Sequence, residues 1–365
     1  MSYEAELEFK RERVAEALKR IGGIDFDVPA PVACPSPNGY RNKAVYQFTV
    51  RNRKTVSGFY RRRSHDVLPT ARCLLQSEQA DLTAAAVCEL ADRLRIPVYD
   101  ERTHKGSLRR MMYRENSCGE AQLVIICADR KLLSRRSEAV NFILTRCPWV
   151  CGLFVCLNSK PTNTVLGGEI LLLDGDPVLS ETLCGYRFEV SPPAFLQVNR
   201  EQAERLYDIA AEFAQPTGAR VLDLYCGTGT LTLRYAGEAA EVVGAEIVPE
   251  AVENAKMNAT RNGVKNATFL CGDAADLAMR FAPGHFDIVS VDPPRRGLDP
   301  AAAQAVIDLA PKKIVYVSCD PATLARDLRL FTDAGYAADR VQPVDMFPRT
   351  EHVECVVGLT KLNVK

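Results

Sequence analysis

An apolar strand that runs through a glycine turn into a helix limits most strongly what this chain can fold into. The strand begins at Val221 and leads into the turn Tyr225-Cys226-Gly227-Thr228-Gly229-Thr230. Gly227 and Gly229 permit backbone conformations and close approaches that a Cβ atom would forbid. Their spacing is not the GxGxxG of dinucleotide-binding proteins, so no pyrophosphate site is indicated. The segment predicts the first strand and the cofactor loop of a doubly wound α/β sheet.

Two further apolar strands each end in an acid. The strand from Glu241 to Ile247 carries Glu246 at its carboxyl end, where an acid can accept both hydroxyls of an adenosine ribose. The strand from Ala267 to Cys271 is followed by Asp273, which is placed to meet an adenine amino group. Either acid alone is as consistent with a solvated loop. Two acids in this order, without a phosphate-binding lysine, favour S-adenosylmethionine over ATP or NAD.

The fourth and fifth predicted strands bring an acid and a thiol to the same rim. The strand Phe286 to Val291 stops at Asp292, where two prolines end the ladder. The apolar run Ile314 to Val317 leads to Cys319. Because ligands of open α/β sheets bind at the carboxyl ends of the strands, Asp292 and Cys319 are expected to face one substrate.

The C-terminal region supplies candidate bases. The segment from Phe347 to Glu354 precedes the last apolar run and contains Glu351, His352 and Glu354. Any of the three has a side chain able to accept a proton. Cys319 is followed by a predicted helix start, a position that favours a lowered thiol pKa.

The region from Phe195 to the C-terminus resembles the RNA uracil-5-methyltransferase family. Five motifs occur in the family's order: Phe195-Leu196-Gln197-Val198-Asn199, DLYCGTG at 223–229, DPPR at 292–295, Ser318 to Asp327, and the ending Pro348 to Glu354. The resemblance implies methyl transfer from S-adenosylmethionine to uracil C5 in RNA. It also implies a Rossmann-like seven-stranded class I methyltransferase domain with an inserted α+β central domain.

The resemblance implies roles for individual residues. The cysteine matching Cys319 is the family's nucleophile, and the glutamate matching Glu354 is its general base, ahead of Glu351 and His352. Uracil C5 is a poor nucleophile until a thiolate adds to C6, and a base must later remove the C5 proton. Residues expected to line the cofactor site are Gln197, Tyr225, Gly227, Gly229, Thr230, Glu246, Asp273 and Asp292.

Three residues are also candidates for holding the target base. Gln197 and Asp292 are expected to hydrogen-bond its N3 and carbonyl edge. Phe195 offers a face on which a base can stack once the uridine is unstacked from its RNA. The alternatives are purely structural roles: Asp292 caps a turn, and Phe195 belongs to the hydrophobic core.

Charge is balanced over the chain, with 46 basic and 46 acidic residues, but it is unevenly distributed. Between Tyr40 and Cys73 there are nine basic residues and one acid, and the candidates for RNA contact are Arg41, Lys43, Arg61, Arg62 and Arg63. The interleaved aromatic residues Tyr46, Phe48, Phe59 and Tyr60 are possible stacking positions, on paired strands with a turn near Ser57-Gly58. A basic face is often only solvated, so RNA contact rests mainly on the resemblance.

Periodicity predicts three regions. Residues 1–33 contain an amphipathic helix from Tyr3 to Ile21, ended by Gly22-Gly23, which the resemblance places against the catalytic domain. Residues 34–188 are expected to form the central α+β RNA-binding domain. Residues 189–365 are expected to form the methyltransferase domain.

The 13 cysteines show no disulfide-like spacing, which favours a reducing, cytoplasmic compartment. Two groups are interpreted as packing residues, with no metal site among them: Cys147, Cys151 and Cys156, and Cys226, Cys271 and Cys355. No apolar run is long enough to span a membrane, and we expect a monomer.

Many members of the family begin with an RNA-binding barrel and a cysteine segment that holds an iron–sulfur cluster. Neither is found in this sequence, in which only Cys73 resembles a cluster ligand, so no iron–sulfur cluster is expected. The chain is either a naturally short member or one whose N-terminus is absent.

The motifs do not name the RNA that is modified. Large-subunit (23S) ribosomal RNA is favoured, and the transfer-RNA T-loop is the alternative. Other classes are a small-molecule or cytosine methyltransferase and a non-catalytic RNA-binding protein.

Overall fold

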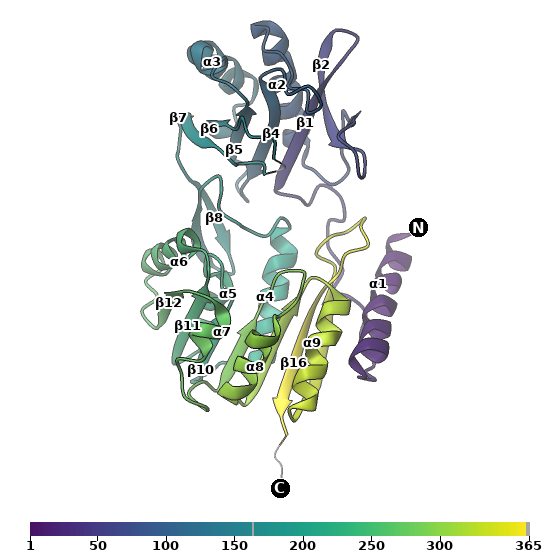
Figure 1. The fold of residues 1–365 in the computed structure, drawn as a ribbon, viewed down its shortest axis with the longest axis vertical. Coiled ribbons are helices and arrows are strands. Elements are labelled where there is room, and N and C mark those ends of the chain that lie inside the picture. The colour runs from purple at the N-terminus through teal and green to yellow at the C-terminus, as the bar shows by residue number, and fades with distance from the viewer. Residues whose placement is uncertain (163, 363–365) are drawn as a thin grey trace. The chain divides into compact units, whose positions relative to one another are not determined.

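The computed structural model describes residues 1–162 and 164–362, which form two compact units (Figure 1). Unit 1 contains residues 1–35, residues 182–188 and the chain from Phe195 onward. Unit 2 contains residues 36–181 and 189–194. The chain therefore leaves unit 1 after its N-terminal segment, returns to it at residue 182, and stays in it from Phe195 onward.

Unit 1 is built on a seven-stranded sheet with the order β12-β11-β10-β13-β14-β16-β15. The five strands on the β12 side run parallel, and β16 pairs antiparallel with both β14 and β15. Their bounds are β10 Arg220–Leu224, β11 Glu241–Glu246, β12 Ala267–Cys271, β13 Ile288–Val291, β14 Lys313–Ser318, β15 Tyr336–Val344 and β16 Glu354–Lys361. The predicted Rossmann-like seven-stranded fold is confirmed.

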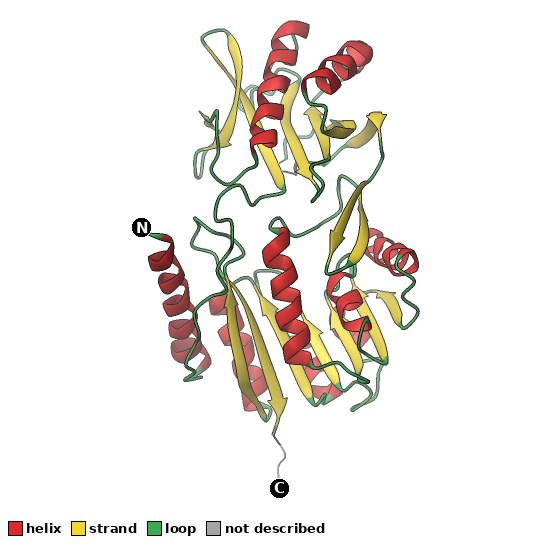
Figure 2. Cartoon of the chain, turned by 180° about the vertical axis from the view of Figure 1, so that it is seen from behind, coloured by secondary structure: helices red, strands yellow, loops and turns green. Residues whose placement is uncertain are grey.

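Helices cover both faces of this sheet (Figures 1 and 2). Along one face α7, α8 and α9 pack in succession, and α4 lies with α5 on the other. The central strands are almost wholly apolar, as is typical of parallel strands buried on both sides. The helices are α4 Arg200–Ala214, α5 Thr230–Ala236, α6 Pro249–Arg261, α7 Ala274–Ala278, α8 Pro300–Leu309 and α9 Pro321–Asp333.

The N-terminal helix α1, Tyr3–Ala17, packs against α9. A π-helical turn, Leu18–Gly22, continues it, and Gly23 ends it in the left-handed region with φ 69°. Val14 and Leu18 are buried in the core of unit 1. The buried residues nearer its start, Glu6 and Lys10, are charged. Its packed face is therefore apolar only toward its C-terminal end.

Unit 2 contains a second seven-stranded sheet, with the order β3-β2-β1-β4-β5-β6-β7. All pairings are antiparallel except that of β5 with β6. The strands are β1 Lys43–Arg51, β2 Lys54–Tyr60, β3 Val67–Pro69, β4 Leu108–Glu115, β5 Ala121–Cys127, β6 Val150–Leu157 and β7 Glu169–Gly175. Helices α2, Glu78–Leu94, and α3, Arg136–Arg146, cover one face. A short turn of 3₁₀ helix, Leu133–Arg135, precedes α3, and β8, Leu179–Leu183, pairs only with β9, Tyr186–Val190.

The hairpin turn expected near Ser57-Gly58 was placed wrongly. The chain reverses at Asn52 and Arg53, both with positive φ (50° and 64°), and Gly58 lies within β2. A Cβ atom on Gly58 would stand 1.9 Å from the carbonyl oxygen of Leu68 on β3. This glycine therefore allows two strands to approach rather than a chain to turn.

None of the helices in the described ranges has both the length and the apolar character needed to cross a bilayer.

Candidate active site

The loop after β10 contains three alternate residues with left-handed backbones. Tyr225, Gly227 and Gly229 have φ of 65°, 54° and 86°. A Cβ atom on Gly227 would meet nothing within 4 Å, whereas one on Gly229 would stand 3.0 Å from the Phe269 ring and 3.1 Å from Ala255. Gly229 thus lets β12 and α6 pack against the loop, and Gly227 leaves one side of the loop backbone open. Such an open backbone fits the close approach of a cofactor.

Two strand-end acids lie around this loop. The Glu246 carboxylate accepts the backbone N–H groups of Gly227 at 3.1 Å and Val248 at 3.0 Å, which ties the loop to the end of β11. Asp273 is exposed and caps the start of α7, where its carboxylate accepts the N–H of Ala275 at 2.9 Å. Burial, with Asp273 as the leading nearby charge, raises the pKa of Tyr225 to about 12. The structure therefore brings Tyr225, Gly227, Glu246 and Asp273 together.

Thr230, also predicted to line the cofactor site, opens α5 and is only 7% exposed. Ile247, in contrast, is 60% exposed although it directly follows Glu246. Sequence reasoning missed Ile247 as a candidate contact because it treated the residue as the last position of the strand. The available signal was an apolar residue immediately after the strand-end acid.

Cys319 and Glu354 lie at the ends of neighbouring antiparallel strands. Ser318, the last residue of β14, pairs with Cys355 of β16, so the next positions across from each other are Cys319 and Glu354. Glu354 is buried, with 4% of its surface exposed, and Cys319 is half-buried. Burial raises the pKa of Glu354 to about 8; the Asp292 charge adds to this rise and Arg295 opposes it.

The pKa of Cys319 moves in the direction opposite to the one expected from its place before a helix. Burial raises it to about 11, Glu354 and Asp292 add to the rise, and Arg295 opposes it. The next residue, Asp320, caps α9: its carboxylate accepts the N–H groups of Ala322 and Thr323 at 2.9 and 3.2 Å. The expectation of a lowered pKa was wrong because burial and the two nearby acids outweigh any effect of the helix start.

Asp292 and Gln197 belong to the same group of side chains. Burial raises the pKa of Asp292, which follows β13, to about 7. Tyr207 of α4 is hydrogen-bonded to Gln197, and burial, together with Asp292 and Glu354 among the nearby charges, raises its pKa well above the usual value. Tyr207 was missed by sequence reasoning because a tyrosine in a helix carries no motif signal.

The rival bases differ from Glu354 in their surroundings. Glu351 is exposed to solvent, while its backbone carbonyl accepts a bond from Arg13 at 2.5 Å. His352 is half-buried, and its pKa is lowered first by burial and then by Arg295. Among the three candidate bases, Glu354 is the one that is buried beside a second acid, Asp292, and its pKa is raised toward neutrality, as suits a general base.

Asp223, the first residue of the DLYCGTG motif, is a further buried acid, to which the sequence analysis assigned no role. It is 1% exposed, accepts a bond from the Thr232 hydroxyl at 2.5 Å, and has its pKa raised by burial to about 7. Asp292 and Glu246 are among the charges that raise it. Asp223 therefore links β10 to α5, the two elements that flank the loop.

Phe195 is 67% exposed, so it is available as a stacking face and is not part of the core. In unit 2, Arg61, Arg62 and Arg63 are exposed, whereas Arg41 and Lys43 are half-buried. Burial and the neighbouring Arg114 charge lower the pKa of Lys43 to about 8.

Two of the four aromatic residues proposed for base stacking are wrongly assigned. Tyr46 and Phe48 are buried, with exposures of 0% and 4%, in the core under the helices of unit 2. Tyr46 also packs on Phe59 and donates to Asp81 at 2.6 Å. Alternation along β1 turns both side chains toward the helices.

The cysteines also required one correction. Cys226, Cys355, Cys147 and Cys156 are buried and Cys151 is half-buried, but Cys271 is exposed at the end of β12. Within the described residues no three His, Cys, Asp or Glu side chains gather as metal ligands would.

The order of the strands in unit 1, the open glycine loop and the acids after successive strands define a class I methyltransferase fold. A family model described as tRNA (uracil-5-)-methyltransferase matches residues 2–362. The chain belongs to this family, which confirms the resemblance inferred from its five motifs and the assignment as an RNA methyltransferase enzyme.

Similar proteins agree with this assignment. Uncharacterized RNA methyltransferases from Clostridium tetani and Halalkalibacterium halodurans are each 40% identical, over 99% and 100% of this chain and 79% and 80% of theirs. Among solved structures, the Pyrococcus abyssi tRNA (uracil-54, C5)-methyltransferase in complex with S-adenosyl-L-homocysteine aligns with a TM-score of 0.82 and 27% identity. That alignment covers 99% of this chain and 84% of the other.

Proposed function

We propose that this protein transfers a methyl group from S-adenosylmethionine to C5 of a uridine in RNA, with Cys319 as nucleophile and Glu354 as general base. The observation that carries the proposal is the strand register that sets Cys319 beside the buried Glu354.

The cofactor loop fits S-adenosylmethionine. Gly227 leaves an open backbone surface, Glu246 and Asp273 supply acceptors for ribose hydroxyls and an adenine amino group, and Ile247 offers an exposed apolar contact. When bound, the cofactor supplies a methyl group on a positively charged sulfur.

The protein's own residues account for the other steps. The Cys319 thiol gives its proton to solvent, and the thiolate adds to C6 of uracil, which makes C5 nucleophilic. After C5 has gained the methyl group, the Glu354 carboxylate removes the C5 proton, the C5–C6 double bond reforms, and the thiolate leaves C6. We further propose that Gln197 and Asp292 hydrogen-bond the edge of the base.

Glu354 must be ionised to act as a base, yet burial raises its pKa to about 8. Arg295 favours the charged form, so it makes the carboxylate available for the proton removal that follows methylation.

The RNA substrate is proposed to be 23S ribosomal RNA, bound in part through Arg41, Lys43, Arg61, Arg62 and Arg63 and by stacking on Phe195. The resemblance to a solved transfer-RNA enzyme favours the T-loop of transfer RNA as a second candidate. The test is to incubate the protein with labelled S-adenosylmethionine and, separately, unmodified ribosomal and transfer RNA, and then to identify the methylated nucleoside. 5-Methyluridine in one pool supports the proposal and selects the substrate; no transfer to either refutes it.

A further inference from the structure

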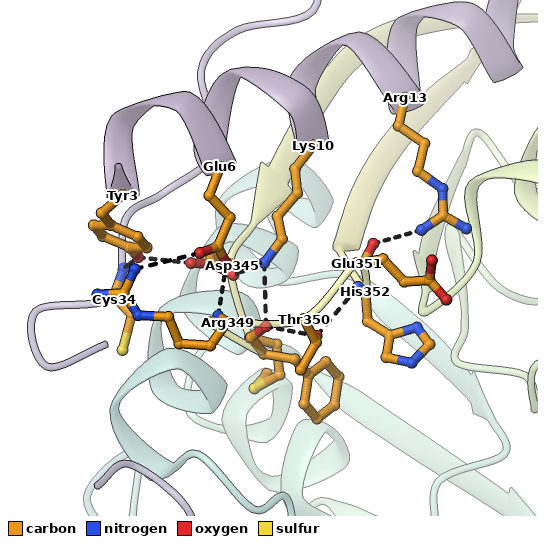
Figure 3. A network of polar contacts seen from close by, with 12 residues as sticks. Tyr3, Glu6, Lys10, Arg13, Cys34, Asp345, Arg349, Thr350, Glu351 and His352 are labelled. Carbon is orange, nitrogen blue, oxygen red and sulfur yellow. Dashed lines mark hydrogen bonds and ion pairs between the residues drawn. The ribbon is translucent and has the colours of Figure 1, made fainter. Parts of the chain in front are cut away.

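Four residues of α1 face the loop between β15 and β16, residues 345–353 (Figure 3). They are spaced three, four and three residues apart along the helix, so they lie on one face. They are Tyr3, Glu6, Lys10 and Arg13. Each makes at least one polar contact with this loop, although α1 and the loop are more than 330 residues apart in sequence.

Lys10 lies at the centre of these contacts. Its side chain is completely buried, and the ammonium group donates to Asp345 at 2.6 Å, to Glu6 at 2.9 Å and to the carbonyl of Phe347 at 3.1 Å. The three acceptors use all three ammonium hydrogens. The Tyr3 hydroxyl donates a hydrogen bond to the other carboxylate oxygen of Asp345 at 2.6 Å. A cation and two acids are thus buried together. Removing the cation would leave the buried Asp345 carboxylate without its ion-pair partner, whereas Glu6 would keep Arg349 at 3.6 Å.

The backbone of the loop is held at several further points. The N–H of Arg349, a residue with φ 65°, donates to Glu6 at 2.7 Å. The Thr350 hydroxyl donates to the Phe347 carbonyl at 2.7 Å and accepts the N–H of His352 at 3.2 Å. Contacts with α1 therefore stabilise a turn that a non-glycine residue rarely adopts.

The start of α4 holds the other side of the loop. Asn199 donates to the carbonyl of Met346, and Gln202 donates to the carbonyl of Asp345, both at 3.0 Å. The loop is therefore hydrogen-bonded to α1 on one side and to the start of α4 on the other, and it is followed directly by Glu354, the first residue of β16.

We infer that Lys10 is a positioning residue for Glu354, because the ion-pair cluster around Lys10 fixes the loop that leads directly into Glu354, the first residue of β16. The inference rests on the proposed function. Cys319 lies between β14 and α9, and it is not a partner in any of the hydrogen bonds of this cluster. Loss of Lys10 should therefore impair proton removal from C5 more than attack on C6. A displacement of about 1 Å at such a group can reduce a rate by roughly 100-fold.

The experiment compares wild type with Lys10→Met, and with Arg11→Met as a matched control. Arg11 is on the same helix and pairs only with the exposed Glu8 among the described residues. Adduct formation is measured with 5-fluorouridine transcripts, and adduct release with the ordinary uridine transcript that the wild type methylates. Lys10→Met should form the fluorouridine adduct within about threefold of the wild-type rate but release ordinary RNA at least about tenfold more slowly, so that a methylated protein–RNA adduct accumulates. Arg11→Met should match wild type.

The inference is overturned if Lys10→Met slows both steps equally or neither. If that protein does not fold, Tyr3→Phe, which removes only the hydroxyl bound to Asp345 and to the N–H of Cys34, takes its place with the same two measurements and the same criteria. A wild-type protein that forms no adduct with any transcript would instead refute the proposed function itself, so the two failures are distinguishable.

Discussion

Glu354 stands across from Cys319 at the ends of two antiparallel strands, one position beyond the Ser318–Cys355 pair. A strand register, fixed by the apolar pattern of β14 and β16, therefore places a thiol and a buried acid at the same point of the sheet edge. This arrangement suits a reaction that needs a nucleophile and a base on one substrate.

Replacing the thiol should stop the reaction. Cys319→Ala is expected to lower methyl transfer to RNA by at least ~10³-fold, because no other group can activate C5 through C6. Cys118→Ala, which removes an exposed thiol of unit 2, is the control and should retain full activity. Transfer of labelled methyl groups measures both, and an active Cys319→Ala protein would contradict the mechanism.

Replacing the base should stop the reaction after methyl transfer and before the RNA is released. Glu354→Gln is expected to add to uridine and to receive the methyl group, then to stall, so that a protein–RNA adduct accumulates on denaturing gels. Glu351→Gln should turn over normally, since Glu351 is exposed to solvent. The reverse pattern would make Glu351 the base.

The raised pKa values predict how activity depends on pH. Both Glu354, with a pKa of about 8, and Cys319, with a pKa of about 11, act in their deprotonated forms, so kcat/KM should rise as pH increases from about 6 to about 9. Because the Glu354 charge is one cause of the raised thiol pKa, Glu354→Gln should shift the alkylation midpoint of Cys319 to lower pH. Mass spectrometry of the Cys319 peptide follows that midpoint. An unchanged or higher midpoint would show that the two groups do not interact.

The two loop glycines should respond differently to alanine. Both have positive φ, but only Gly229 lacks room for a Cβ atom. Gly229→Ala should lower the free energy of unfolding by about 2–4 kcal/mol, and Gly227→Ala by about 1 kcal/mol while weakening cofactor binding. Denaturant unfolding and cofactor titration measure the two effects. Equal losses of stability would show that packing on Phe269 does not matter.

The exposed arginines should contribute to RNA affinity through charge. Replacing Arg61, Arg62 and Arg63 by alanine should weaken RNA binding and reduce the slope of log affinity against log salt by roughly 0.7–0.9 for each phosphate that is no longer neutralised. Arg130→Ala, which removes an exposed arginine paired with Glu169, is the control. An unchanged salt slope in the triple variant would exclude this surface from the interface.

Much of unit 1 was predictable because its strands are short apolar runs that each end in a polar residue. The register that joins Cys319 to Glu354 was not, since it depends on β16 inserting between β14 and β15, a long-range pairing without a local signal. The thiol's pKa was predicted in the wrong direction because neither its partial burial nor its nearness to Glu354 and Asp292 has a local sequence signal.

Unit 2 was less predictable. Gly58 was interpreted as a turn residue because a glycine next to a serine usually marks one, whereas here it serves a close strand contact. The role of Lys10 could not be seen in the sequence either: a lysine on an amphipathic helix is normally solvated, and only the distant Asp345 makes its burial favourable.

The measurement that tests the central claim most directly is mass spectrometry of the adduct formed by wild-type protein, labelled S-adenosylmethionine and 5-fluorouridine RNA. The account predicts a methylated 5-fluorouridine attached through C6 to Cys319, because fluorine cannot leave C5 as a proton does. Attachment to another cysteine, or methylation of ordinary uridine in the same RNA without any adduct at fluorouridine, would contradict it.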